Sequence, residues 1–199
     1  ARMTGIGFLR FANTNNIKVI GFVDSDPSLQ GMIIDNQMIY KPDSILAMKS
    51  KNKNLLVLIA VALKEDEIVD TMQSMGLTKN DYVNYSKYVK TYYTIDIVGT
   101  CNLKCPSCSW SMDETKNLNT MSFDHFKKIT EKIVNEVDIV SHVSLYNWGE
   151  PFLHPKLNFI IEHLHDLGIA TAVSSNLSIK SSVQIQKVVK SAPDYLKIS

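Results

Sequence analysis

Residues 93–108 read YTIDIVGTCNLKCPSC and join a strand pattern to a cysteine-bearing loop. The first six residues are mainly β-branched and aromatic, which predicts a strand over Tyr93–Val98. The loop after it holds all three cysteines of the chain, Cys101, Cys105 and Cys108. Loops at the carboxyl ends of parallel strands are where α/β enzymes place their chemistry. The stretch therefore predicts an α/β fold with a thiol site at a strand end.

Strands and helices alternate from this stretch to Ser199. The predicted strands are Tyr93–Val98, Ile139–Trp148, Ile169–Ser175 and Tyr195–Ser199. The predicted helices between them are Ser122–Val137 with Ser122 as N-cap, Pro155–Leu167 ended by Gly168, and Ile179–Ser191. A closed (β/α) barrel needs more strands than these, so residues 91–199 are expected to form the first half of a barrel.

The residues before this series predict a second α/β region. Apolar runs indicate buried strands at Ile17–Val23 and Leu55–Ala62, with a helix over Lys64–Met75 and an amphipathic segment over Gly5–Ala12. Strands that are apolar on both faces point to a parallel sheet. The Gly-rich turn that opens a nucleotide-binding unit does not precede the first strand, and the chain is expected to start inside its first helix.

The predicted organisation is therefore α/β throughout, with an incomplete Rossmann-like unit over residues 1–90 and a partial barrel over 91–199. A charged, Tyr-rich segment at Lys87–Thr91 marks the expected boundary.

Composition narrows the functional class. The 199 residues suit one domain or two small ones, and 45% hydrophobic with 21% charged residues is ordinary for a globular protein. Lys and Arg number 21 and Asp and Glu 20, so the net charge of +1 argues against nucleic acid as a partner. The longest apolar run, Leu55–Leu63, is about half of the ~20 residues that a membrane helix needs. With no secretory signal visible, a cytoplasmic location and no membrane partner are expected.

The three cysteines have the pattern of metal ligands. An odd number of cysteines within eight residues is not a disulfide framework. Soft thiolates at gaps of three and two residues select an iron–sulfur cluster, zinc or copper(I). Three ligands to a four-iron cluster would leave one iron open to a substrate. The alternative is a structural zinc site with a fourth ligand such as Asp113 or His125.

The CxxxCxxC spacing after a first strand resembles the radical S-adenosylmethionine enzymes. The resemblance implies a 4Fe-4S cluster on Cys101, Cys105 and Cys108, whose open iron chelates S-adenosylmethionine. It further implies reductive cleavage of that cofactor to a 5′-deoxyadenosyl radical, an electron donor such as flavodoxin or ferredoxin, and a small-molecule or peptide substrate. Ser107 stands where the family often has an aromatic residue, and Trp110 is a nearby ring.

Two later strand ends extend the resemblance. Residues 147–151, NWGEP, are similar to the family's GGE-type motif, with Trp148 in place of the first glycine. The resemblance implies that Gly149 and Glu150 contact the methionine amino group. Ser174 and Asn176, at the end of the next strand, are similar to groups that meet the carboxylate or ribose of the cofactor. Residues 147–155 and 174–178 look most like members with a SPASM-type auxiliary-cluster domain.

These polar residues also have plain structural interpretations. Glu150 could cap the helix near Pro155, and Asn176 could be an N-cap or a turn residue.

In the first region, residues 21–31 are similar to the second strand and loop of Rossmann-like nucleotide-sugar proteins. Asp24 is there a candidate for ribose binding or, in the sequence Asp-Ser-Asp-Pro, a turn residue.

The expected function is that of a radical S-adenosylmethionine enzyme that starts radical chemistry on an unidentified substrate, with peptide or sugar modification as candidate outcomes. The alternative is a non-enzymatic module that binds zinc or a cluster.

Overall fold

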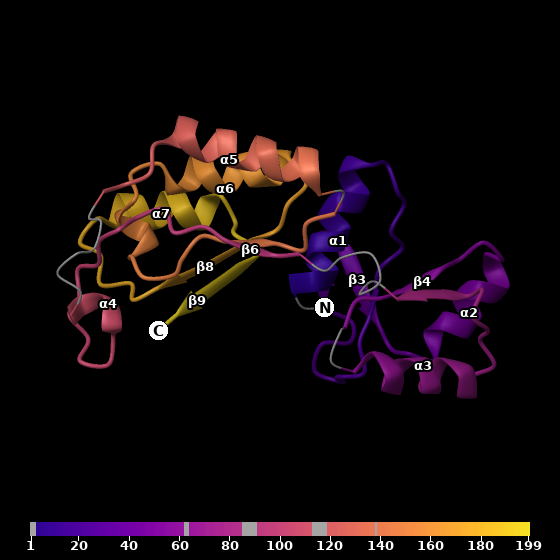
Figure 1. Ribbon diagram of the computed structural model, residues 1–199. Coiled ribbons are helices and arrows are strands. Elements are labelled where there is room, and N and C mark those ends of the chain that lie inside the picture. Colours follow the sequence, from indigo (N-terminus) through magenta and orange to yellow (C-terminus); the bar gives the residue numbers. More distant parts are fainter. Residues whose placement is uncertain (1–2, 62–63, 85–90, 113–118, 138) are drawn as a thin grey trace. The chain divides into compact units, whose positions relative to one another are not determined.

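The computed structural model describes residues 3–61, 64–84, 91–112, 119–137 and 139–199, and the chain divides into two compact units, Ala1–Lys90 and Thr91–Ser199 (Figure 1). Both units combine helices with parallel strand pairs, so the α/β class predicted from the sequence is confirmed. Residues 87–90 of the predicted boundary segment lie outside the described residues.

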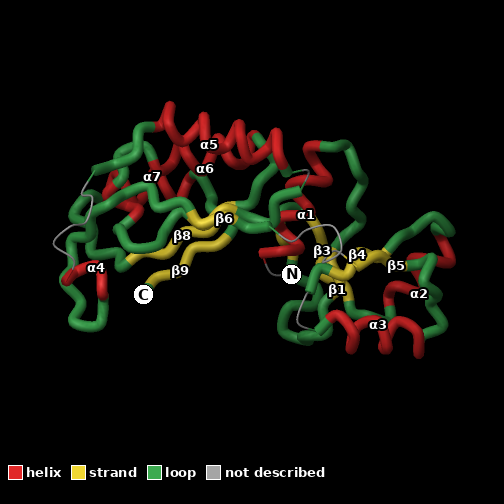
Figure 2. The backbone as a smooth tube through the Cα atoms, in the orientation of Figure 1, coloured by secondary structure: helices red, strands yellow, loops and turns green. Residues whose placement is uncertain are grey.

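The second unit is built on a parallel sheet of four strands in the order β6-β7-β8-β9, counted over its described residues. The strands are β6 (Tyr93–Thr94), β7 (Val143–Ser144), β8 (Thr171–Ser175) and β9 (Tyr195–Ile198). The register pairs Tyr93 with Val143 and Val143 with Thr171. This order is the one predicted for the first strands of a barrel, and the sheet is open (Figure 2).

The strands β6 and β7 are shorter than predicted. After β6 the chain still runs through buried apolar residues, but the backbone carbonyl of Ile97 accepts a hydrogen bond from Met121, and Val98 forms an antiparallel bridge with Thr120. The second half of the predicted strand therefore pairs with the 119–121 segment instead of the sheet.

Three long helices cover the same side of this sheet in Figures 1 and 2: α5 (Phe123–Glu136), α6 (Leu157–Asp166) and α7 (Ser182–Lys190). Ser122 caps α5 as predicted, because its hydroxyl accepts a hydrogen bond from the backbone nitrogen of His125. Gly168 follows α6 in the left-handed conformation, with φ of 72°, as its role in ending the helix requires. The sequence did not predict two short helices, α4 (Ser109–Met112) and the 3-10 helix η2 (Pro151–Leu153).

The core of the second unit lies between these helices and the sheet. Its fully buried side chains include Phe126 of α5, Val188 of α7 and Val173 of β8, together with Ile160, Ile161 and Leu164 of α6. This packing holds the carboxyl ends of the strands in fixed register, so the loops that leave them start from defined positions.

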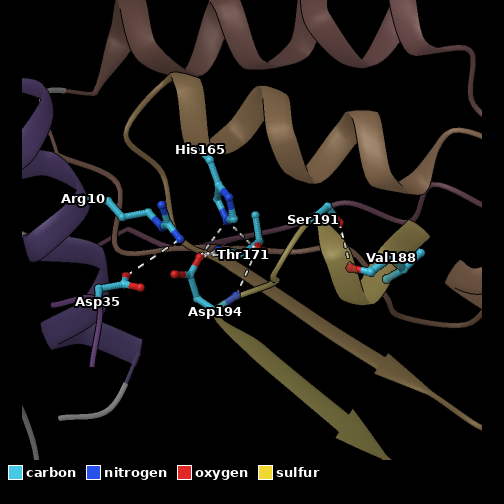
Figure 3. A network of polar contacts seen from close by, with 7 residues as sticks. All are labelled: Arg10, Asp35, His165, Thr171, Val188, Ser191 and Asp194. Carbon is cyan, nitrogen blue, oxygen red and sulfur yellow. Dashed lines mark hydrogen bonds and ion pairs between the residues drawn. The ribbon is translucent and has the colours of Figure 1, made fainter. Parts of the chain in front are cut away.

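A buried polar network fixes the opposite, amino end of β8 (Figure 3). One carboxylate oxygen of Asp194 lies 2.9 Å from Nε2 of His165 and accepts a hydrogen bond of 2.9 Å from the backbone nitrogen of Thr171. The Thr171 hydroxyl lies 3.2 Å from the same His165 nitrogen. These contacts tie the end of α6, the start of β8 and the segment before β9 together.

The first unit contains α1 (Met3–Thr14), β1 (Phe22–Val23), β2 (Ile33–Ile34), β3 (Gln37–Tyr40), α2 (Ser44–Lys51), β4 (Val57–Ile59), α3 (Glu65–Ser74) and β5 (Tyr82–Asn84). In its described residues, β1-β3-β2 form one sheet and β4-β5 another. The pairs β1 with β3 and β4 with β5 are parallel, whereas β2 runs antiparallel to β3.

The predicted buried strand over Ile17–Val23 is wrong for most of its length. Strand pairing begins only at Phe22, and the side chains of Ile17 and Ile20 are 45% and 39% exposed. The predicted strand over Leu55–Ala62 is reduced to β4, and Ala62 lies outside the described residues. In both segments a ladder forms only where a partner strand is present, and apolar composition alone does not extend it.

No helix in the described part of the chain is both long and apolar enough to cross a bilayer.

Candidate functional site

The cysteine loop leaves the sheet after β6 and lies at its carboxyl edge. Cys101 and Cys105 are exposed, and Cys108 is half-buried. The backbone nitrogen of Leu103 donates to Sγ of Cys101 at 3.5 Å, and the nitrogen of Cys108 donates to the carbonyl of Cys105 at 3.0 Å. The loop therefore turns twice within eight residues and keeps its thiols accessible.

Glu150, at the end of the NWGEP segment, is buried and joins two loops. Its carboxylate accepts hydrogen bonds from the backbone nitrogen of Phe152 at 3.0 Å and the hydroxyl of Ser175 at 2.8 Å. Its second oxygen accepts from the backbone nitrogen of Asn176 at 2.9 Å. Glu150 is thus the N-cap of η2, near but not at the predicted capping position before Pro155, and it also holds the loop after β8.

Gly149 is required by a close backbone contact. A Cβ atom at this position would lie 1.6 Å from the carbonyl oxygen of Val98, so any side chain would force the backbone apart. The amide nitrogens of Trp148 and Gly149 both donate to the carboxylate of Asp96, at 3.2 and 3.4 Å. Asp96 was not singled out from the sequence, although a lone acid between Ile95 and Ile97 is a detectable signal.

Asn176 connects the loop after β8 to the cysteine loop. Its side-chain nitrogen lies 3.6 Å from Sγ of Cys101 and donates to Oδ1 of Asn102 at 3.0 Å. Asn102 in turn donates to the carbonyl of Ser178 at 2.7 Å. Asn102 was also missed, because its partners are more than 70 residues away in the sequence.

The loops that follow β6, β7 and β8 are thereby joined in one chain of hydrogen bonds, from Cys101 through Asn176 to Glu150. The backbone nitrogen of Glu150 also donates to the carbonyl of Thr100 at 2.8 Å, which joins the loop after β7 directly to the residue before Cys101. The structure thus brings together Cys101, Gly149, Glu150 and Asn176 of the residues singled out in the sequence.

Ser174 lies apart from this network. It is half-buried in β8, where it pairs with Lys197 of β9. Because neighbouring side chains of a strand point to opposite faces, Ser174 faces away from the side on which Ser175 meets Glu150.

Two tryptophans stack beside the cysteine loop. The rings of Trp110, in α4, and Trp148 have centroids 6.2 Å apart and an interplanar angle of 19°. Trp148 is 43% exposed. The residue that replaces the first glycine of the GGE-type motif therefore contributes an aromatic surface next to the loop.

His154 fixes the end of η2 and is a structural residue. Its Nδ1 accepts a hydrogen bond from the backbone nitrogen of Lys156 at 3.0 Å, so Nε2 carries the proton and donates to the carbonyl of Met121 at 2.8 Å. Burial lowers the pKa of His154, while the bond to Met121 acts in the opposite direction. The ring is therefore neutral at neutral pH.

Asp24 forms a turn in the first unit. Its carboxylate accepts a hydrogen bond from the backbone nitrogen of Asp26 at 3.0 Å, and Asp26 accepts from Ser28 in the same manner. This is the turn geometry that the sequence offered as the alternative to ribose binding.

The chemistry of the donor set fits an iron–sulfur cluster. Among the described residues, no group of three or more His, Cys, Asp or Glu side chains is arranged to hold a metal ion, and Asp113 lies outside them. The three thiols nevertheless share a short, accessible loop, and Cys101 receives N–H donors from Leu103 and Asn176. Donors aimed at ligand sulfur are among the features that tune protein-bound clusters.

No protein-family model and no curated protein matches the chain at a significant level. Among solved structures, the chain is similar to BtrN in complex with AdoMet and 2-DOIA, with 16% identity, a TM-score of 0.48, and 54% of this chain and 44% of BtrN covered. It is also similar to Streptococcus suis SuiB bound to precursor peptide SuiA, with 13% identity, a TM-score of 0.44, and 77% and 34% covered.

The chain thus spans less than half the length of either protein.

Proposed function

We propose that this chain holds a 4Fe-4S cluster on Cys101, Cys105 and Cys108 and cleaves S-adenosylmethionine reductively to start radical chemistry on a substrate. The observation that supports it is the hydrogen-bond chain that joins the cysteine loop to Glu150 and Asn176 at the carboxyl edge of the sheet. Parallel sheets place their ligand sites at this edge. When bound, the cluster would supply an electron to the cofactor and an open iron to chelate it.

The residues of the chain would then orient the cofactor. Three donors in the described structure occupy the carboxylate of Glu150, and a carboxylate offers about four acceptor positions. The remaining position would accept a hydrogen from the methionine amino group. Gly149 keeps the backbone of the same loop against Val98, which fixes where this carboxylate lies.

Ser174 and Asn176 are the proposed contacts for the other polar groups of the cofactor. The side chain of Asn176 already contacts Cys101 and Asn102, so it would bind the cofactor while holding the cysteine loop. Ser174 lies on the other face of β8 and would act only on a cofactor that reaches that face. The electron would come from a donor such as flavodoxin or ferredoxin, and the substrate class is a peptide or small molecule.

Anaerobic reconstitution with iron and sulfide is the test of this proposal. We expect absorbance near 400 nm and about four irons per chain in the wild type, both lost in the Cys105→Ala variant. Adding dithionite and S-adenosylmethionine should then release 5′-deoxyadenosine, measured by liquid chromatography.

The outcomes separate the alternatives. A colourless protein that takes up one zinc on the same thiols would reject the radical proposal and support a zinc-binding module. A coloured protein that binds S-adenosylmethionine without cleaving it would support a cluster-binding module. Asn54→Ala, an exposed substitution in the first unit, is the control for handling and oxygen damage.

A further inference from the structure

Asn102 makes two long-range hydrogen bonds although it is exposed. Its Nδ2 donates to the carbonyl of Ser178, and its Oδ1 accepts from Nδ2 of Asn176. The side chain thereby spans the gap between the loop after β6 and the loop after β8. Exposed hydrogen bonds contribute only about 1 kcal/mol each to stability, so this bridge has its main effect on the local position of the loops.

The orientation of both amides follows from their partners. Nδ2 of Asn102 faces a carbonyl, which accepts only, and Oδ1 of Asn176 faces the backbone N–H of Ser178 at 2.8 Å, which donates only. Neither amide can be flipped without placing like groups together. Nδ2 of Asn176 is consequently directed at Cys101 and Asn102 at the same time.

This arrangement ties the Cys101 thiol to the loop after β8. Its sulfur accepts hydrogen bonds from Nδ2 of Asn176 at 3.6 Å and from the backbone N–H of Leu103 at 3.5 Å. Without the acceptor on Asn102, the amide of Asn176 would lose one of the two groups that aim it at Cys101. N–H donors to ligand sulfur draw electron density from it and raise the reduction potential of a cluster.

We propose that Asn102 is a positioning residue for Cys101: it aims the Asn176 amide at the Cys101 sulfur and fastens the cysteine loop to the 176–178 segment. The effect on a cluster depends on the proposed function, whereas the effect on the loop does not. A purely local turn role for Asn102 would affect neither Ser178 nor Asn176.

The test uses two variants of Asn102 and two readouts. Asn102→Ala removes both bonds of the bridge. Asn102→Asp keeps the acceptor for Asn176 but cannot donate to the Ser178 carbonyl. Amide hydrogen exchange by NMR reports on the loops before any cluster is present, and the reduction potential from an EPR-monitored titration reports on the reconstituted protein.

We expect exchange at the Leu103 and Ser178 amides to be roughly fivefold faster in Asn102→Ala, as the loss of about 1 kcal/mol predicts. Asn102→Asp should also raise exchange at Ser178. The potential should fall in Asn102→Ala with iron content unchanged. The negative charge added by Asn102→Asp lowers the potential by itself, so that variant is compared by amide exchange alone. Asn54→Ala should leave all values at those of the wild type.

Unchanged exchange at both amides in Asn102→Ala would overturn the proposal, whether or not a cluster forms. If exchange rises and no variant takes up iron, Asn102 still positions the cysteine loop and the cluster assignment fails by itself. If exchange rises while the potential of Asn102→Ala equals that of the wild type, Asn102 does not aim the Asn176 amide, and that part of the proposal is rejected.

Discussion

The two ends of β8 carry polar networks with opposite exposure. At the amino end, the side chain of Asp194 is only 2% exposed and Thr171 is fully buried. At the carboxyl end, the network begins at the buried Glu150 but continues to exposed groups, Asn102 and Cys101. The amino end is thus a buried network of donors and acceptors, whereas the network at the carboxyl end reaches an exposed thiol. Changes at the amino end should therefore affect stability alone, whereas changes at the carboxyl end should also affect ligand binding.

Gly149→Ala should have the largest effect, because it should lower both the stability of the protein and its iron uptake. The new Cβ would lie 1.6 Å from a backbone oxygen that cannot turn away, so we expect a loss of about 3 kcal/mol in the free energy of unfolding. Iron uptake should fall as well, since the displaced loop lies against Val98 and Thr100 just before Cys101. Urea unfolding and iron analysis measure the two effects.

Gly31→Ala is the matched control. Gly31 has φ of +85°, and a Cβ added there would have no atom within 4 Å. The loss in the free energy of unfolding therefore comes only from the backbone conformation and is about 1 kcal/mol. Equal losses in the two variants would show that the contact with Val98 relaxes freely.

Asp194→Ala should destabilise the protein without affecting the cysteine loop. It leaves the buried backbone N–H of Thr171 without its acceptor and removes the partner of His165, for an expected loss of about 2–3 kcal/mol. Asp194→Asn retains an acceptor and should cost less. The comparison between the two ends of β8 fails if iron uptake of the folded Asp194→Ala variant falls below that of the wild type.

His154→Gln should have the smallest effect, confined to acidic pH. Burial lowers the pKa of His154 from its ordinary value of 6.5, so the unfolded chain binds more protons than the folded one as pH falls below that value. The stability that the neutral ring contributes is therefore complete above pH 6.5 and is lost as pH falls through the folded pKa. A glutamine amide can donate to Met121 and accept from Lys156 without titrating.

The free energy of unfolding of His154→Gln, measured between pH 7.5 and 5, should decline less steeply than that of the wild type. His142 and His163 also have pKa values lowered by burial, and their contributions remain in both proteins. Parallel curves would exclude His154 as a source of the acid sensitivity.

Local signals in the sequence predicted the second unit well. The cap at Ser122 and the glycine stop at Gly168 are decided within one turn of the helix, so the sequence alone contains them. Strand lengths depended on pairing that the local sequence does not encode. Val98 is as apolar as a sheet residue, yet it pairs with Thr120. The buried strand predicted from Ile17 failed for the same reason.

The site was predictable in its residue types but not in its connections. Motif spacing pointed to the cysteines, Gly149 and Glu150, and the structure adds what Glu150 and Asn176 contact. Asn102 and Asp96 were missed because their partners lie about 50 to 75 residues away along the chain. No periodicity in a single sequence reports such contacts.

The Glu150 carboxylate has a thermodynamic consequence, because it is shared between two loops. A ligand that binds this carboxylate more tightly in one arrangement of the Asn176 loop would favour that arrangement, and with it one position of Cys101. Linkage is reciprocal, so loading the thiols would change the affinity at Glu150 by the same factor. Occupancy of the thiols and ligand binding at Glu150 would then rise or fall together.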